Sequence, residues 1–403
     1  MIRRIAFLVV YVLGAIVLFA LAALAANAGE AYVPPAGDAW ETITPEEGGF
    51  DPAKLQAAVD FAIANETRFP PALDGKADAR DLALKTAFDF AREPYSTAIG
   101  PFKTRAPANG LILNAGRIVA EWGATREVDM TFSITKTFLS SVAGVAFDKG
   151  MIRDTQDRVG DYVVPTEDFA SPHNAPITWD QMLRQTSGWA GTLWDKPWWA
   201  DRPGAAGDPP WSDLAKGPPA PGSAYEYNDV RVNALALALT HLWRRPLPGV
   251  LKHYVMDPID ASSTWHWEGY ENSFATIGGR KMRVVPGGGH WGGGIFVSAR
   301  DLARLGLLAS RKGAWGEKRI LSEAWIAKAM TPTDVEPGYG YMNWFLNTGR
   351  KRFETARADT VVFLGAGTNA VLVDFEHDTV AVVRWIDNAK LAEFVTLLMA
   401  ARE

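Results

Sequence analysis

Apolar residues recur at the three- and four-residue spacing of amphipathic helices, and short apolar runs of strand length lie between these stretches. The runs contain β-branched and aromatic residues and are separated by turn residues, as in strands. The expected helices cover residues 51–65, 133–149, 230–243 and 301–308, with a last one from Lys390. The expected strands are residues 111–113 and 118–120, joined by a turn at 114–117, and residues 341–346, 359–364, 370–374 and 380–385.

The expected strands lie near the two ends of the chain, with helices and loops between them. This order predicts an α+β fold in which N-terminal and C-terminal segments share one antiparallel sheet flanked by helices. About residues 165–300 are expected to form a mainly helical and loop subdomain, with the candidate active site between it and the sheet. Six glycines at 287–294 predict tight turns beside this cleft. The domain as a whole is expected to cover residues 51–403.

The N-terminus resembles a targeting signal. Two arginines precede 22 uncharged, mostly apolar residues, 5–26, a run long enough to span a bilayer as a helix. An Ala-Asn-Ala sequence ends the run and fits a cleavage site, so residues 1–28 are either a signal peptide or a membrane anchor. Both alternatives predict an exported, periplasmic protein, released or anchored to the inner membrane by residues 5–26. Residues 29–50 are expected to be a linker.

Composition excludes several classes of function. The net charge is −5 and 22% of the residues are charged, so nothing indicates a nucleic-acid partner. Membrane contact is expected only through the N-terminal segment. The absence of cysteine excludes disulfides, thiolate metal sites and cysteine nucleophiles. The six histidines form no His-x-His or His-Glu-x-x-His pattern, so we expect neither a metal site nor a cofactor. The sequence does not indicate the oligomeric state.

The chemistry indicated most strongly is nucleophilic. Ser133-Ile134-Thr135-Lys136 is the one Ser-x-x-Lys sequence in the chain, and it opens an expected core helix. Residues three apart share a helix face, so Ser133 and Lys136 project to the same side. Burial lowers the pKa of a lysine, which can then accept the proton of a serine hydroxyl. The free N–H groups of the helix N-terminus favour a developing oxyanion. An N-cap serine beside a solvated lysine is the alternative.

Four further blocks favour the catalytic interpretation, and they follow one another in order along the chain. The blocks are residues 130–138 with 147–152, 177–188 ending in Thr-Ser-Gly, 221–229 beginning with Pro-Gly, and 292–303 with its Asp-Leu-Ala. Together they resemble the serine β-lactamase-like, penicillin-recognising superfamily of class C β-lactamases, DD-peptidases, carboxylesterases and 6-aminohexanoate-dimer hydrolases. The likeness spans roughly residues 45–400, and Gln185 stands where the family has histidine. The resemblance implies an acyl-enzyme on Ser133.

The resemblance also implies a catalytic tyrosine. Tyr227-Asn228-Asp229 follows the Pro-Gly pair at the family's distance, with Asp229 where asparagine is usual. Tyr341-Met342-Asn343 matches Tyr-x-Asn literally, but we interpret it as part of a structural strand. A phenol beside Lys136 can relay a proton. Because a carboxylate at Asp229 would keep Lys136 charged, Tyr227 becomes the favoured base, while an N-cap role for Asp229 is the alternative.

The family's third motif carries a lysine or histidine on a strand that faces the serine. The corresponding stretch here, residues 363–369, has neither. Its small residues still allow a backbone N–H of Gly367 or Thr368 to complete an oxyanion hole with that of Ser133. A substrate carboxylate would lose its solvation here without gaining a cation, unless Arg184 or Arg283 supplies one from another loop.

The remaining expectations concern the substrate. His290 and Trp291 in the glycine-rich loop, with the tryptophans between Trp189 and Trp211, are expected near the substrate as an aromatic wall. We expect a serine hydrolase that cleaves a small ester or amide, with neutral substrates preferred over β-lactams. The alternatives are a β-lactamase or DD-peptidase proper, a penicillin-sensor-like domain that acylates without turnover, and a scaffold with a structural role.

Overall fold

A computed structural model describes residues 31–37, 39–69, 95, 97–163, 167–201, 217–345, 353 and 355–402. Within these ranges, no helix is long and apolar enough to cross a membrane. The expected signal peptide or anchor at residues 1–28 lies outside the described residues, as does Trp211.

A six-stranded antiparallel sheet joins the two ends of the chain, as predicted. Its strand order is β12-β13-β14-β15-β1-β2. The N-terminal hairpin pairs with the C-terminal strands through β1 and β15, where Leu111 lies opposite Val382. The strands are β1 (Asn109–Asn114), β2 (Arg117–Trp122), β12 (Trp344–Phe345), β13 (Val361–Gly365), β14 (Asn369–Asp374) and β15 (Thr379–Arg384).

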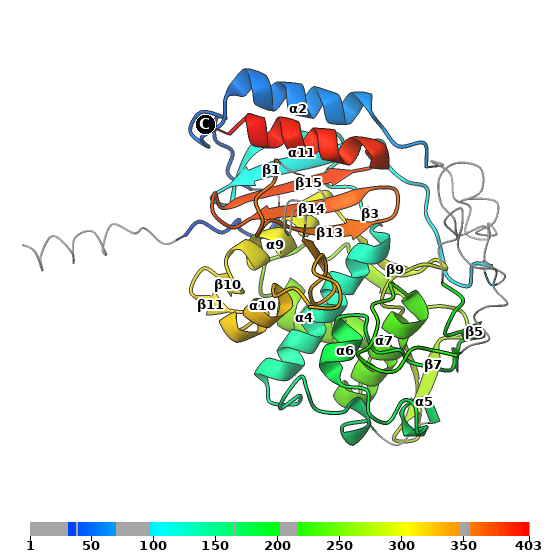
Figure 1. The fold of residues 1–403 in the computed structure, drawn as a ribbon. Helices are drawn as coiled ribbons and strands as arrows, with labels where there is room; N and C mark the ends of the chain where they lie inside the picture. The colour runs from blue at the N-terminus through cyan, green and yellow to red at the C-terminus, as the bar shows by residue number, and fades with distance from the viewer. Residues whose placement is uncertain are drawn as a thin grey trace, which may run out of the picture.

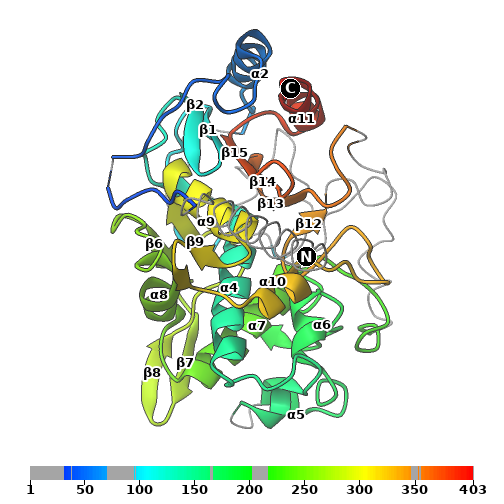
Figure 2. The same cartoon turned by 90° about the vertical axis from the view of Figure 1, so that its left-hand side faces the viewer.

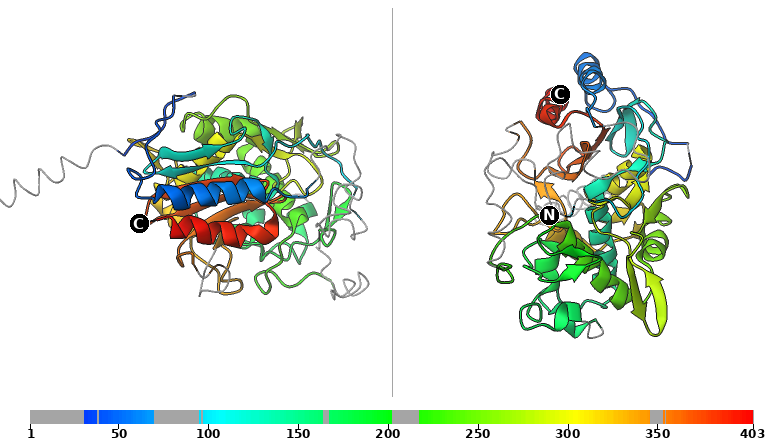
Figure 3. Two further views of the ribbon diagram at one scale, coloured as in Figure 1. Left: turned by 90° about the horizontal axis from the view of Figure 1, so that it is seen from above. Right: turned by 90° about the vertical axis from the view of Figure 1, so that its right-hand side faces the viewer.

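Helices cover both faces of this sheet, which explains why every residue of β14 and β15 is buried. On one face, α2 (Pro52–Ala64) and α11 (Leu391–Ala400) lie side by side (Figures 1 and 3). On the other face, α9 (Ala299–Ser310) packs against β1, β14 and β15. The α+β architecture is therefore the predicted one, with apolar cores on both sides of the sheet.

The middle of the chain forms the part of the molecule farthest from α2 and α11 (Figure 2). Its central helix, α4 (Thr135–Asp148), packs against α7 (Asp229–Trp243), α8 (Leu247–Leu251) and α10 (Glu323–Ala329). A three-stranded sheet lies beside it, in the order β3 (Asp129–Met130), β9 (Gly294–Val297) and β6 (His266–Glu268). The smaller elements are α5 (Glu167–Ala170), α6 (Trp179–Leu183), β4 (Thr192–Leu193), β5 (Lys196–Pro197), β7 (Phe274–Ile277), β8 (Arg280–Arg283), β10 (Ala314–Trp315) and β11 (Lys318–Arg319). Single turns are η2 (Phe132–Ile134), η3 (Val159–Asp161), η5 (Lys252–Met256) and η7 (Asn388–Lys390).

Two segments differ from the sequence-based expectation. Part of the predicted linker is packed against the body: Tyr32 and Val33 contact the apolar core, and Trp40 is 6% exposed and donates a hydrogen bond from its indole to the carbonyl of Gly116. The backbone N–H of Ile43 also donates a hydrogen bond to the carbonyl of Ile118 in β2, because this edge strand has backbone groups that no neighbouring strand satisfies. The expected strand at 341–346 is shorter, with only β12 among its described residues.

Candidate active site

Ser133 lies on a tight turn between a short strand and the central helix. Residues of η2 separate β3 from α4, so the serine precedes the α-helix by two residues instead of starting it. Phe132, directly before it, has a left-handed backbone with φ of +49°, which is unfavourable for a residue with a bulky side chain. Its ring packs at 5.6 Å from that of Phe69 and 6.4 Å from that of Trp385. This packing holds a strained turn immediately before Ser133.

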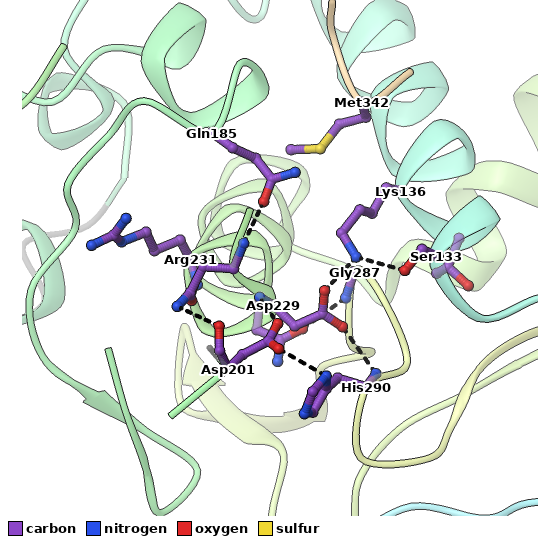
Figure 4. Close-up of polar contacts among 12 residues, drawn as sticks. Ser133, Lys136, Gln185, Asp201, Asp229, Arg231, Gly287, His290 and Met342 are labelled. Atoms are coloured by element: carbon purple, nitrogen blue, oxygen red, sulfur yellow. Dashed lines mark hydrogen bonds and ion pairs between the residues drawn. The ribbon is translucent and has the colours of Figure 1, made fainter. Parts of the chain in front are cut away.

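Lys136 is the direct polar partner of the serine. Its Nζ lies 3.0 Å from Ser133 Oγ, and the lysine is only 1% exposed (Figure 4). The same Nζ forms an ion pair with Asp229, whose side chain is 2% exposed. Asp229 is the first residue of α7, but the helix is capped by the side chain of Asn228, which accepts from the backbone of Arg231. The carboxylate of Asp229 is therefore directed to Lys136 and is not the helix cap.

Asp229 determines the protonation state of Lys136. Burial by itself would lower the pKa of the lysine, but the charge of Asp229 and the hydrogen bond to it outweigh burial and raise this pKa. Lys136 is consequently an ammonium at neutral pH. Burial alone predicted a lowered pKa for Lys136, and this prediction is wrong in direction. The expectation that Asp229 keeps Lys136 charged has the right sign.

Tyr227 completes the group around the serine. Its ring centroid lies 4.5 Å from the Lys136 ammonium, and Lys136 and Ser133 both act to lower the pKa of its hydroxyl. Burial raises the pKa of Tyr227; Lys136 opposes this rise and Asp229 adds to it. The resting site therefore holds a neutral phenol beside an ammonium–carboxylate pair. The ring of Trp344 stacks on Tyr227 at 5.5 Å and an angle of 28°.

Two more buried groups adjoin Asp229. His290 Nδ1 lies 2.9 Å from Asp201 Oδ1, and Asp201 accepts the backbone N–H of Asp229. One ligand atom from each of these three residues lies within 4.8 Å of the others, a set that could hold a metal ion. Each of the three side chains already has a protein partner, so we interpret the cluster as a hydrogen-bonded ion-pair network.

A cavity of about 310 Å³ opens beside Ser133 and Tyr227. One wall is the turn after β13, residues 365–368, which is the stretch expected as the third motif. A Cβ on Gly365 would lie 2.0 Å from the carbonyl oxygen of Thr131 and 3.3 Å from the nitrogen of Ser133. Only glycine lets the strand lie this close to the turn that carries Ser133. Gly367 and Thr368, the predicted oxyanion-hole residues, also line the cavity.

The other predicted substrate contacts lie elsewhere. Trp291 has no exposed surface and packs against Tyr270, and Trp189 is equally buried. The structure therefore places both rings in the core, where large apolar side chains gain most from burial. His290 is held in the ion-pair network. The aromatic residues that line the cavity are Phe69, Tyr227 and Trp344, and the sequence indicated Trp344 only as part of a strand.

The two arginines that the sequence offered as substitutes for the missing third-motif cation are not among the described residues that line the cavity. Arg184 pairs with Asp180, and Arg283 bonds the carbonyl of Tyr270. Arg68 instead lines the cavity, with Asp387 at 3.9 Å and a side chain that is 80% exposed. No sequence pattern marked Arg68, because it follows α2 in an irregular segment.

The literal Tyr-x-Asn match at residues 341–343 is structural, as interpreted. The hydroxyl of Tyr341 donates to Asp180, and the amide of Asn343 donates to the carbonyl of Ala329. Gln185, which stands where the family has histidine, accepts the backbone N–H of Asn228 at 2.8 Å. It thereby fixes the backbone between Tyr227 and Asp229.

A serine on a turn before a buried helix, with a lysine at its hydroxyl and a tyrosine beside the lysine, is an arrangement suited to nucleophilic catalysis. The beta-lactamase family model matches residues 108–396. The chain therefore belongs to the beta-lactamase family, whose members are serine hydrolases. A search of the curated proteins finds no match.

Solved structures share the fold at low sequence identity. A penicillin-binding protein homologue from Caulobacter crescentus is 14% identical, with a TM-score of 0.53, and the match covers 82% of this chain and 98% of that one. EstCE1, a hydrolase with promiscuous acyltransferase activity, is 14% identical with a TM-score of 0.51 over 87% and 99% of the two chains. A predicted 6-aminohexanoate-dimer hydrolase from Bacillus anthracis is 17% identical with a TM-score of 0.50 over 84% and 88%.

Proposed function

We propose that this protein hydrolyses neutral esters or linear amides through an acyl-enzyme on Ser133. The observation that carries the proposal is the position of Ser133 Oγ, 3.0 Å from a buried lysine and at the wall of a cavity of about 310 Å³. A serine hydroxyl beside a proton-transfer group is the arrangement that nucleophilic catalysis requires. A neighbouring cavity supplies space for the acyl chain.

In the proposed acylation, Ser133 Oγ attacks the substrate carbonyl carbon and its proton passes to the Tyr227–Lys136 pair. Because Asp229 keeps Lys136 protonated, we assign the accepting role to Tyr227 in its phenolate form, which the site reaches when the phenol proton is lost to solvent before the attack and which the ammonium stabilises. The carbonyl oxygen, now negative, accepts hydrogen bonds from the backbone N–H of Ser133 and from the 365–368 turn. The proton then reaches the leaving oxygen or nitrogen. Water attacks the resulting ester by the reverse proton path.

The charges around the cavity support a neutral substrate. Residues 365–368 supply no cation, and Lys136 is already paired with Asp229. The charges among the described lining residues are those of Arg68 and Asp387, which face one another. A carboxylate next to the scissile bond would lose its hydration without a dedicated partner. EstCE1 is named a hydrolase with promiscuous acyltransferase activity and the Bacillus anthracis protein a 6-aminohexanoate-dimer hydrolase, and both names agree with the acyl transfer that we propose here.

The test compares kcat/KM for p-nitrophenyl butyrate, a linear aminohexanoate amide and nitrocefin on one preparation, with Ser133→Ala as the control. We expect the ester or the amide to give the highest value and the control to be inactive. The highest value for nitrocefin would identify a β-lactamase instead. A burst of one equivalent without steady turnover would identify a domain that acylates and binds, as a sensor does.

We also propose that the chain is exported, because an arginine pair precedes the uncharged run 5–26. A reporter enzyme that works only in the periplasm, fused after Glu403, should be active in a bacterial host. Activity restricted to a reporter that works only in the cytoplasm would contradict export.

A further inference from the structure

The residues that surround Asp229 include two groups that the proposed reaction does not use. Asp201 and His290 are buried, with side chains 6% and 5% exposed, and they come from loops far apart in the sequence. Their mutual contact joins His290 Nδ1 to Asp201 Oδ1 at 2.9 Å. Buried ionisable groups are costly unless they are paired and hydrogen-bonded, so this pair requires an explanation.

Both members of the pair bind Asp229, and they do so at different atoms. Asp201 accepts the backbone N–H of Asp229 through Oδ2, while the backbone N–H of His290 donates to Asp229 Oδ2 at 2.9 Å (Figure 4). The other carboxylate oxygen of Asp229, Oδ1, contacts Lys136. The carboxylate is therefore held at two points, one by the loop of His290 and one by the lysine.

The glycine-rich loop is shaped around this carboxylate. A Cβ on Gly288 would lie 2.1 Å from Asp229 Oδ2, so any larger residue would displace the carboxylate or the loop. The ring of His290 also contacts that of Trp291, with the ring centroids 4.5 Å apart, so the imidazole is held by a second contact besides Asp201. Asp201 and His290 therefore have little freedom to move independently of Asp229.

We propose that Asp201 and His290 are positioning residues that hold Asp229 against Lys136 and thereby align the ammonium with Ser133. This inference rests on the proposed function of Ser133. The pair acts through Asp229, and neither Asp201 nor His290 is among the described residues that line the cavity. The other titratable groups around it are Lys136, Tyr227 and Tyr270.

A double-mutant cycle between Asp201→Asn and Asp229→Asn tests the proposal. The measured quantity is the rate at which a fluorophosphonate labels Ser133, taken at the pH optimum of each variant so that alignment is separated from protonation. In the otherwise unchanged chain, Asp201→Asn should slow labelling by roughly 10- to 100-fold, the effect of a displacement of about 1 Å. In the Asp229→Asn background, Asp201→Asn should change the labelling rate by less than about 3-fold, because the carboxylate that Asp201 positions is gone.

Two histidine variants provide a second arm if Asp201→Asn does not fold. His290→Asn places an amide nitrogen near the position of Nδ1 and should retain most of the rate. His290→Leu, which keeps the backbone N–H but loses the contact with Asp201, should slow labelling as Asp201→Asn does. Asp374→Asn is the matched control, because it breaks a His377–Asp374 pair of the same chemistry, 2.7 Å long, at the far end of β14.

The outcomes separate the two proposals. Equal slowing by Asp201→Asn in both backgrounds, or no slowing by Asp201→Asn and His290→Leu, would overturn the positioning role while Ser133 remains the labelled nucleophile. Slowing by Asp374→Asn to the same extent would show a general effect of losing a His–Asp pair and would also overturn it. If the unaltered protein is not labelled on Ser133, the proposed function itself fails, and the positioning role fails with it.

Discussion

Replacing Asp229 with asparagine removes one negative charge from the site and keeps the size of the side chain. The substitution restores the residue that is usual in the family at this position. In the structure, the carboxylate of Asp229 raises the pKa of Lys136 and also that of Tyr227. Whichever of the two accepts the serine proton, the substitution should therefore make the accepting form available at lower pH.

The size of the effect follows from the contact. An opposite charge within about 4–6 Å typically changes a pKa by about 1–3. A change of 1 corresponds to about 1.4 kcal/mol. At an effective dielectric constant near 20, two charges about 4 Å apart interact by about 4 kcal/mol, which agrees with the upper end of this range. The acid limb of the kcat/KM profile should therefore move down by about one to three pH units.

The assay is the pH dependence of kcat/KM for p-nitrophenyl butyrate, which reports ionisations of the free enzyme. Asp301→Asn is the matched control, because Asp301 is also a buried acid in the first turn of a helix and lies 3.9 Å from an arginine, Arg304. It should lower Tm without moving the acid limb. An acid limb that stays in place or moves to higher pH in Asp229→Asn would refute the account of the charge network.

Three further results are expected. Fluorophosphonate should add one label, on Ser133, that is lost in Ser133→Ala, and Tyr227→Phe should slow labelling by at least about 100-fold, as measured by intact mass; labelling elsewhere would reject the assignment. Gly144→Ala should lower the free energy of unfolding in urea by about 1–2 kcal/mol, because its Cβ would lie 2.4 Å from Trp325 Nε1, and overpacking outweighs the gain in helix propensity. Trp344→Ala should raise KM for p-nitrophenyl butyrate by about 3- to 10-fold, since an aromatic contact contributes about 0.5–1.5 kcal/mol; an unchanged KM would place the acyl chain elsewhere.

Much of the fold could be predicted because its signals are local. The spacing of apolar residues marks α2, α7 and α9, and the Asn-Ala-Gly-Arg turn marks the β1–β2 hairpin. Ser133 and Lys136 could be paired because three residues separate neighbours on a helical turn. The charge that Asp229 imposes on Lys136 could also be anticipated, since it depends only on the two residues being close.

The wall of the cavity and the network around Asp229 could not be predicted, because their members come together only when distant segments pack. Arg68 follows α2, Trp344 lies in β12, and Asp201 meets His290 across 89 positions of sequence. A tryptophan in a loop carries no local mark of whether it faces a cleft or the core, and Trp291 is in the core. The sequence by itself therefore determined the elements and the pairing of Ser133 with Lys136, while tertiary packing decided which side chains surround them.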